Sequence, residues 1–194
     1  MSFPAPHNGY APAEDSWLLA QTIEKNAKVV HGAKCMDMGC GNGIQTAALL
    51  ASGARHVTCV DVNPDALRAT KQVVDHYFGG QKKNIRHVSS FLFDHVERAE
   101  KFDVVVFNPP YVPSEKIKWA EVDGGKKGRE IIDAFLEQLP AHLEKNGVCL
   151  LLQSSLNSIH LTRKKCVEKK MVCRIIARQK IAFEELLVIK ITFK

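Results

Sequence analysis

The amino-acid sequence predicts an α/β fold: a mostly parallel sheet with helices on both faces, closed by an antiparallel hairpin at the C-terminus. Three observations predict it. Short apolar runs alternate with stretches of helical periodicity, which is the pattern of strand–helix units. The run Phe102–Phe107 contains consecutive valines with no polar break, as expected for a strand buried on both faces. No helix separates the last two apolar runs, so we expect them to pair at one edge of the sheet.

These patterns, together with the positions of the prolines, predict the elements in order. The first helix, Glu14–Lys25, gathers its apolar residues on one side. Pro64 is expected in the first turn of a helix, where its missing N–H costs nothing. Pro140 is expected to kink or split the helix over Gly128–Glu144. Further helices are expected over Ile44–Ser52 and Ser154–Lys170. The seven expected strands are Lys34–Met38, His56–Val62, Ile85–Ser89, Phe102–Phe107, Gly147–Gln153, Val172–Gln179 and Glu185–Phe193.

Length and composition limit the classes of protein to which this chain can belong. The chain has 194 residues, which suits one domain over residues 1–194 with a full hydrophobic core. It has no run of eighteen apolar residues and no basic N-terminal stretch leading into an apolar one. We therefore expect a cytoplasmic protein without a membrane span. None of the six cysteines forms a C-x-x-C pair, so we expect buried, reduced thiols and neither a metal site nor a disulfide framework.

The net charge of +6 is placed unevenly. Residues 160–194 carry ten Lys or Arg residues and three Glu residues, so the rest of the chain is close to neutral. A basic segment of this kind can contact RNA or a ribosome. Aromatic residues are not interleaved with the basic ones, and a solvated surface is therefore the favoured interpretation of the segment.

A glycine-rich turn follows the first predicted strand. It reads Asp37-Met38-Gly39-Cys40-Gly41-Asn42-Gly43 and opens a helix whose free N–H groups can face a ligand. Such a turn alone fits a dinucleotide site equally well. The D-x-G-x-G-x-G spacing, with its leading carboxylate, instead suits a ligand that carries an ammonium or sulfonium group. Asp61 ends the second strand, where a carboxylate can accept both ribose hydroxyls. Its alternative role, as a helix cap before Pro64, suits Asn63 better.

The motif Asn108-Pro109-Pro110-Tyr111 directly follows the valine-rich strand. An amide or exocyclic amine nitrogen is a poor nucleophile, and its reaction needs acceptors for both N–H hydrogens. The side-chain oxygen of Asn108 can be one acceptor and the Pro109 carbonyl the other, with the two prolines fixing its direction. Tyr111 offers a flat face for a planar group. A proline-rich turn is the plain structural alternative. The position at the end of a central parallel strand favours catalysis by positioning and preorganised acceptors.

Residues 34–155 resemble the Rossmann-like class I methyltransferases, and the motif resembles the N-P-P-Y signature of amino-group methyltransferases. The resemblance implies S-adenosylmethionine as cofactor, with Asp37, Gly39 and Gly41 near its amino acid end, Asp61 on its ribose and Asn108 beside its methyl group. The family's acidic adenine-binding position aligns with Phe91 here. The adenine is then expected to meet the Leu92 backbone and an aromatic wall, with a shifted Asp94 as the alternative.

Two flanking segments, Tyr10–Ser16 and Gly124–Asp133, resemble the HemK-related release-factor glutamine methyltransferases, in their short archaeal and eukaryotic branch. The resemblance implies that Ser16 contacts the cofactor and that Pro110 and Tyr111 hold the substrate. Glu14 and Asp15 would shape the entrance, or serve only as first-turn carboxylates of a helix. The glycines of the second segment would line the substrate entrance, or would serve only as turn residues between a loop and a helix. The basic residues there would add positive charge or be solvated. These residues are Gly124, Gly125, Gly128, Lys126, Lys127 and Arg129.

The resemblance implies N5-methylation of the glutamine in the Gly-Gly-Gln loop of a class I release factor. It also implies a small zinc-binding activator subunit as a partner. Almost nothing precedes Tyr10, so we expect the substrate to dock on the catalytic domain alone or with such a partner. Three rival hypotheses remain: a protein lysine methyltransferase, an adenine methyltransferase acting on RNA or DNA, and an inactive binding scaffold. The motif Asn108–Tyr111 suits adenine as well as glutamine, and Phe91 is the feature that favours the scaffold.

Overall fold

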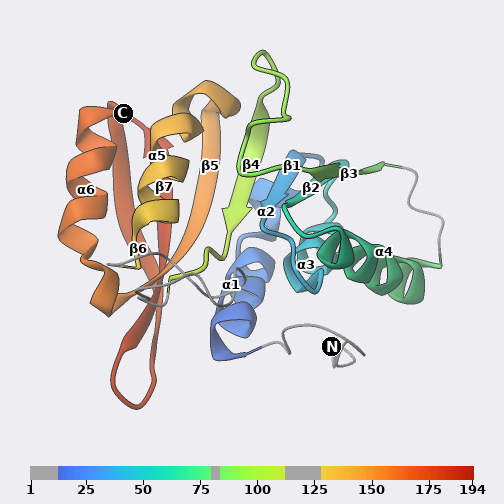
Figure 1. The fold of residues 1–194 in the computed structure, drawn as a ribbon, viewed down its shortest axis with the longest axis horizontal. Coiled ribbons are helices and arrows are strands. Elements are labelled where there is room, and N and C mark those ends of the chain that lie inside the picture. Colours follow the sequence, from blue (N-terminus) through green and yellow to red (C-terminus); the bar gives the residue numbers. More distant parts are fainter. Residues whose placement is uncertain (1–12, 80–83, 112–127) are drawn as a thin grey trace.

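The computed structural model describes residues 13–79, 84–111 and 128–194 (Figure 1). Seven strands and six α-helices are assigned within these ranges. The helices are α1 (Glu14–Lys25), α2 (Ala27–Val30), α3 (Ile44–Ala51), α4 (Pro64–Phe78), α5 (Glu130–His142) and α6 (Ile159–Glu168), with a 3-10 turn, η1, at Ser155–Asn157. The strands are β1 (Lys34–Met38), β2 (His56–Asp61), β3 (Ile85–Ser89), β4 (Phe102–Phe107), β5 (Leu143–Ser154), β6 (Met171–Lys180) and β7 (Glu185–Phe193).

The strands form one sheet in the order β3-β2-β1-β4-β5-β7-β6. Pairing is parallel from β3 to β5, whereas β7 runs antiparallel to both β5 and β6. This confirms the predicted parallel sheet and its C-terminal hairpin. Strand β1 lies between β2 and β4, so the chain crosses over on opposite sides of β1. In such sheets, ligands bind beyond the carboxyl ends of the strands at this reversal.

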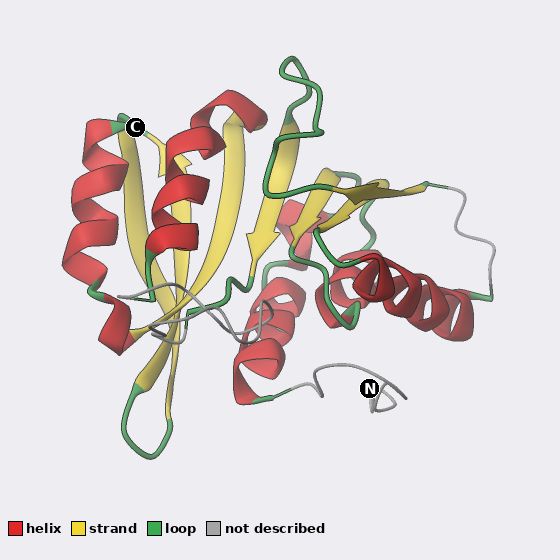
Figure 2. Ribbon diagram, in the orientation of Figure 1, coloured by secondary structure: helices red, strands yellow, loops and turns green. Residues whose placement is uncertain are grey.

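Helices cover both faces of the sheet, as predicted (Figure 2). Helices α1 to α4 pack on one face in a core that includes Cys35 and Val104. Helices α5 and α6 pack on the other face with Met36 and Val105. Neighbouring residues of a strand therefore enter different cores, as the two-residue period of a strand requires. Because both faces are covered, the functional residues collect at the carboxyl edge of the sheet.

Some boundaries differ from the predictions. Helix α2 was not expected, and the stretch predicted as one helix from Ser154 divides at Ser158, which has a left-handed φ of 54°. Strand β5 begins at Leu143, four residues before the predicted start. Helix α5 runs through Pro140 without being split and ends at His142. Pro140 lies in the last turn of α5, where its missing N–H removes a single hydrogen bond to the carbonyl four residues earlier.

The thiols have the environment expected of them. Five of the six cysteines are buried, Cys173 is half-buried, and all six are free. None of the helices in the described ranges is long and apolar enough to cross a membrane.

Candidate active site

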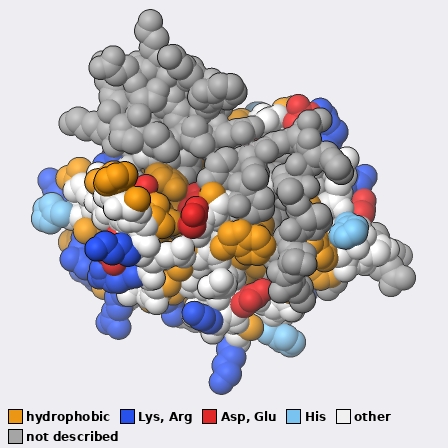
Figure 3. Space-filling view, turned by 90° about the horizontal axis from the view of Figure 1, so that it is seen from below, with side chains coloured by type: hydrophobic (Ala, Val, Ile, Leu, Met, Phe, Trp, Pro, Cys, Tyr) orange, Lys and Arg blue, Asp and Glu red, His pale blue; other side chains and the backbone are white. Residues whose placement is uncertain are grey.

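The predicted site residues gather at one edge of the sheet, beyond the carboxyl ends of β1 to β4. Figure 3 views the molecule from this edge. Lys and Arg side chains gather on its left, which is the side of α6 and β6 in Figure 1. Several basic residues of the segment 160–194 are already paired: Lys165 and Lys169 both bind Glu137, and Arg178 binds Glu185 at 2.8 Å. The predicted contact of this segment with RNA or a ribosome stays a prediction.

The glycine turn after β1 adopts left-handed backbone at three positions. The φ angles of Gly39, Gly41 and Gly43 are 62°, 51° and 80°. A Cβ on Gly43 would lie 2.8 Å from the backbone of Thr70, and one on Gly39 would lie 3.3 Å from the Phe107 ring. Within residues 13–79, 84–111 and 128–194, a Cβ on Gly41 would meet only the Gly39 carbonyl oxygen, at 3.8 Å. The turn is thus packed against α4 and β4 at its ends and open at Gly41, where a ligand can reach the backbone.

Asp61 at the end of β2 faces this turn. Its Oδ2 accepts a hydrogen bond from the Gly41 N–H at 3.0 Å, and its Oδ1 accepts one from the Asn63 N–H at 2.8 Å. Burial raises the pKa of Asp61, and the backbone N–H groups partly offset that shift. The side chain of Asn63 accepts from the Asp65 N–H and caps α4, as the sequence predicted. Asp61 is therefore left to hold the turn and to offer its remaining lone pairs to a ligand.

Asp37 lies beneath the glycine turn and is 1% exposed. Its Oδ2 accepts a hydrogen bond of 2.6 Å from the Thr46 hydroxyl of α3. Burial raises the pKa of Asp37 to about 7, with a smaller contribution from the charge of Asp61, and the Thr46 hydrogen bond opposes the shift. The carboxyl group can therefore influence a ligand through its charge and through the turn it supports, with little direct contact.

The loop after β3 carries the residue that departs from the family pattern. Phe91 is 47% exposed, and Leu92 has a left-handed φ of 45° although it is buried. A non-glycine residue in this conformation is unusual and is often found at functional sites. Val62, which follows β2, is 50% exposed, and β2 and β3 are paired neighbours up to Asp61 and Ser89. Two exposed apolar side chains thus follow adjacent strand ends, beside the Asp61 carboxylate.

Among the described residues, Asn108 is held from one side only. Its Nδ2 lies 3.5 Å from the Ser16 hydroxyl oxygen of α1, a long hydrogen bond. Its Oδ1 is buried, and in the part of the chain that the structure describes it has no hydrogen-bond partner. Leaving a buried acceptor without a partner costs roughly 1–3 kcal/mol. Such a group at the end of a central strand is a place where a substrate N–H fits.

Tyr111 and helix α1 are joined through Asp15. The Tyr111 hydroxyl donates a hydrogen bond of 3.1 Å to Asp15 Oδ2, while Asp15 Oδ1 accepts from both the N–H and the hydroxyl of Ser16. The Ser16 carbonyl in turn accepts from Gln45 Nε2 of α3 at 3.0 Å. Asp15 is buried, whereas Glu14 is exposed. The first turn of α1 therefore connects the N-P-P-Y motif to the helix that follows the glycine turn.

Arg129 does not have either of the roles considered for it. It is 4% exposed, and its guanidinium donates to the carbonyls of Asn157 and Ser158, to the Thr162 hydroxyl and to Asp133. A buried guanidinium with these partners supports structure, and adds no charge to a substrate entrance. Gly128 has a left-handed φ of 64°, which suits a loop ending at a helix. Gly124, Gly125, Lys126 and Lys127 lie outside the described residues.

Sequence reasoning missed Thr46, Val62 and Asn157. Thr46 and Asn157 are ordinary polar residues in helical stretches, and only the packed structure brings them next to Asp37 and Tyr111. Val62 follows a strand-ending carboxylate, and its place directly after Asp61 was a signal that could have been used.

Comparison with known proteins identifies the family. The methyltransferase small domain family matches residues 13–181. A putative protein N5-glutamine methyltransferase of Methanocaldococcus jannaschii is 39% identical over 186 residues, which cover 93% of this chain and 89% of the relative. This chain belongs to the HemK-related glutamine methyltransferases. The methyltransferase HEMK2 of Homo sapiens is 31% identical over 161 residues, 74% of this chain and 70% of the relative, and places the chain in the short archaeal and eukaryotic branch.

A solved structure of the same branch has the same fold. It is that of the E. cuniculi Mtq2–Trm112 complex, described as responsible for methylation of the eRF1 translation termination factor. The likeness has a TM-score of 0.75 at 26% identity and covers 96% of this chain and 99% of that chain. The likeness confirms the predicted class I methyltransferase fold. This HemK-related protein is therefore a methyltransferase. Its Asn108–Tyr111 motif directly follows the central strand β4.

Proposed function

We propose that this methyltransferase transfers the methyl group of S-adenosylmethionine to the side-chain nitrogen of the glutamine in the Gly-Gly-Gln motif of a class I release factor. The observation that carries the proposal is the buried Oδ1 of Asn108, an acceptor without a partner among the described residues. It belongs to the motif at the end of β4, beside the open glycine turn. The names of the M. jannaschii and E. cuniculi relatives support glutamine and a release factor as the substrate class.

Asn108 and Pro109 would prepare the substrate nitrogen for attack. Asn108 Oδ1 accepts one amide hydrogen and the Pro109 carbonyl the other, so the nitrogen can become pyramidal. S-adenosylmethionine supplies an electrophilic methyl group on its sulfonium. The two acceptors would hold the nitrogen with its lone pair toward that methyl group. After transfer the cofactor would leave as S-adenosylhomocysteine, and the nitrogen would release its extra proton to water. Pro110 restricts the backbone, and the Tyr111 ring supports the flat carboxamide. Positioning and preorganised acceptors supply the acceleration.

The cofactor would lie across the ends of β1, β2 and β3. Gly39 and Gly41 allow it to approach the backbone, and Ser16 would lie near its amino acid carboxylate. Asp61 would accept the ribose hydroxyls, with lone pairs that Gly41 and Asn63 do not use. These groups fit a ligand with a cationic end, because two carboxyl groups lie beside the turn, that of Asp37 buried and that of Asp61 half-buried.

The adenine would be held by apolar contact, where other members of the family use a carboxylate. Phe91 and Val62 are exposed apolar side chains that follow adjacent strands, and Leu92 presents a left-handed backbone between Phe91 and the core. A planar base between such side chains gains stacking and apolar contact. The Leu92 backbone would supply the hydrogen bond to the adenine edge.

The contacts of Asp15 and Asn108 help to decide between glutamine and the rival substrates. A lysine must lose a proton before it can attack, and the carboxylates of Glu14 and Asp15 are the candidates to take it. Asp15 is buried and bonded to Tyr111 and Ser16, whereas Glu14 is exposed. The acceptor that remains, Asn108 Oδ1, is a neutral amide oxygen and suits a neutral N–H donor. Adenine fits this acceptor too, but its flipping calls for aromatic and basic groups around the motif. Phe91, the feature that suggested an inactive scaffold, suits adenine binding by contact.

A small activator subunit is part of the proposal. The E. cuniculi relative is described in complex with Trm112, and the likeness covers nearly all of both chains. We expect this methyltransferase to work with a partner of the same kind, for which zinc binding is the sequence-based expectation.

The substrate is tested with labelled S-adenosylmethionine, with and without a candidate activator. The protein is mixed with a release factor, with the same factor carrying Asn in place of the motif glutamine, with lysine-rich proteins and with total RNA. We expect label in the unaltered factor alone, on the glutamine side chain by mass spectrometry. Label in RNA or on lysine, or equal label in the factor without the glutamine, would overturn the substrate.

Cofactor affinity is expected to depend on pH through Asp37. In the free protein the pKa of this buried carboxyl is raised to about 7. A cationic ligand stabilises the carboxylate and lowers its pKa, so binding releases a proton. Affinity for S-adenosylmethionine should therefore rise with pH, by up to about tenfold per unit, until about pH 7 and stay constant above it. Calorimetric titrations at several pH values measure this. The D37N variant should lose the dependence between pH 5.5 and 7, and an unchanged profile in that variant would assign the proton elsewhere.

A further inference from the structure

We propose that Asn157 is a positioning residue for methyl transfer, because its side-chain amide joins the backbone of Tyr111 to that of Gly128. This inference rests on the proposed role of the Asn108–Tyr111 motif. Asn157 lies at the end of η1, far from the cofactor turn in the sequence. Its contribution would be to hold the motif in the geometry that catalysis needs.

Every polar atom of the Asn157 side chain is used. Nδ2 donates to the Tyr111 carbonyl at 2.9 Å and to the Gly128 carbonyl at 3.0 Å. Oδ1 accepts from the Ser154 N–H at 3.2 Å. The residue is 1% exposed, so water does not compete for these bonds. An amide group has two donor hydrogens, and here each one binds a carbonyl on a different side of residues 112–127.

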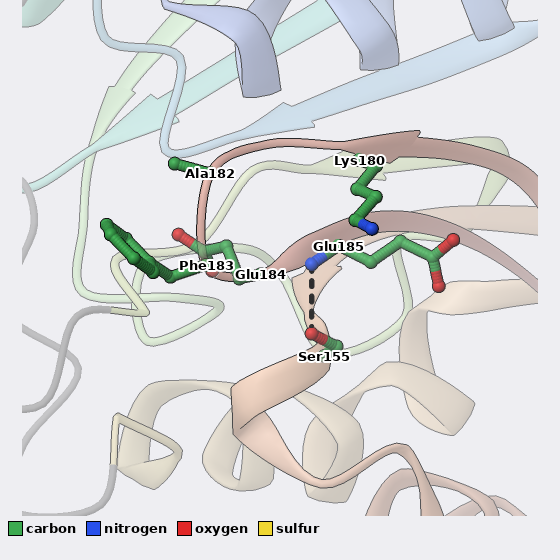
Figure 4. A pocket seen from close by; sticks show the side chains of 6 residues that line it. All are labelled: Ser155, Lys180, Ala182, Phe183, Glu184 and Glu185. Atoms are coloured by element: carbon green, nitrogen blue, oxygen red, sulfur yellow. Dashed lines mark hydrogen bonds between the residues drawn. The ribbon is translucent and has the colours of Figure 1, made fainter.

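Asn157 is itself held by its surroundings. Its carbonyl accepts hydrogen bonds from Gln153 Nε2 at 3.2 Å and from the Arg129 guanidinium. The β6–β7 hairpin holds the other residues of the turn: the Glu185 N–H donates to the Ser155 hydroxyl at 3.0 Å (Figure 4), and the Ser154 hydroxyl donates to Glu184. The turn is thus fixed from β5, from Arg129 directly before α5 and from the hairpin. A donor on such a turn can determine where its partner lies.

Tyr111 is consequently held at both ends. Its hydroxyl donates to Asp15 Oδ2 at 3.1 Å, and its carbonyl accepts from Asn157 at 2.9 Å. Two fixed points along one residue set both the direction of its ring and the path of the backbone back to Asn108. The ring is the surface on which the substrate carboxamide would lie. A displacement of about 1 Å at a reacting group can cost about 10²-fold in rate.

The N157D variant tests this role with little change in size. At neutral pH the carboxylate has no hydrogen to donate and faces two carbonyl oxygens, so the Tyr111 backbone should move away. We expect kcat for the release factor to fall by about 10²-fold. Affinity for S-adenosylmethionine should stay within about threefold, because the cofactor groups follow other strands. Burial and the two carbonyls favour the protonated acid, which can donate one hydrogen bond. Relative to the unaltered protein, the variant's kcat should therefore recover as pH falls toward 5.

A matched control lies in the same buried network. The Thr162 hydroxyl donates to Gln153 Oε1 at 2.6 Å and accepts from Arg129 at 3.1 Å, and it has no hydrogen bond to Tyr111 or Gly128. The T162V variant removes these bonds and should lower the unfolding temperature while leaving kcat within about twofold. If both variants lose kcat in proportion to their loss of stability, Asn157 is merely structural and the proposal is overturned.

A spectroscopic readout separates this inference from the proposed substrate. The chain has three tyrosines, so 3-fluorotyrosine labelling gives three fluorine resonances, and Y111F identifies that of Tyr111. We expect this resonance to shift or broaden in N157D and to stay in place in T162V. An unmoved Tyr111 resonance in N157D overturns the inference, whatever the substrate is. Absence of methylation by the unaltered protein with its activator would overturn the proposed function only.

Discussion

Replacing Asn108 with alanine is expected to reduce methyl transfer by about 10²–10³-fold and to leave cofactor binding nearly unchanged. The variant removes the Oδ1 acceptor, which is buried and has no partner among the described residues. Loss of one preorganised hydrogen-bonding group in an active site typically costs this much in rate. The loss should appear in kcat, because the bond to the nitrogen strengthens as the nitrogen becomes cationic. Single-turnover assays at saturating release factor, with calorimetry for the cofactor, measure the two effects.

The control for this change is another truncation of asparagine to alanine. Asn26 at the end of α1 donates from its side chain to the Thr22 carbonyl at 2.8 Å and lies away from the strand ends. The N26A variant should have the same kcat as the unaltered protein. Turnover of N108A within a few fold of the unaltered protein would refute the role given to Asn108, and so would an equal loss in N26A.

The G41A variant is expected to lose most of its affinity for S-adenosylmethionine, by about 10²-fold or more. Among the described residues, only the Gly39 carbonyl oxygen lies within 4 Å of the new methyl group. The space around it is assigned to the cofactor, so the methyl group and the ligand would compete for it. The φ of 51° also makes any side chain there cost roughly 1–2 kcal/mol. Calorimetric titration measures the loss of cofactor affinity, and thermal unfolding measures the loss of stability caused by backbone strain.

Gly79 provides a matched control for backbone strain. It has a φ of 63° and caps the end of α4, and a Cβ there would meet nothing within 4 Å in the part of the chain that the structure describes. The G79A variant should lose about as much stability as G41A and bind the cofactor normally. If the two variants lose affinity equally, strain alone accounts for the result and the cofactor does not approach Gly41.

The sequence was sufficient for the parts of the fold that depend on local pattern. Alternating strands and helices, Pro64 at a helix start and Asn63 at its cap are all local features, and the structure confirms them. Boundaries failed where a single backbone angle decided them. Ser158 divides the predicted helix because it adopts a left-handed φ, and nothing in its residue type indicates this.

Prediction of the site was limited in the same way. The residues at strand ends could be found, because parallel strands bring their carboxyl ends to one edge. Arg129 was misjudged, since a loop arginine looks solvated until the structure places it among Asn157, Ser158 and Thr162. Asn157 has no motif of its own, and its importance comes only from its distance to Tyr111. Side chains that act by supporting others cannot be recognised before the chain is folded.

The two fixed points on Tyr111 also bear on when activity can arise during folding. One joins it to Asp15, 96 positions earlier in the chain, and the other to Asn157, 46 positions later. Contacts between such distant residues carry a large loop-closure entropy and tend to form late. A chain with its helices and central strands already paired would therefore still be inactive. In a refolding experiment, methyl transfer should return last, after cofactor binding, and so report the completed native state.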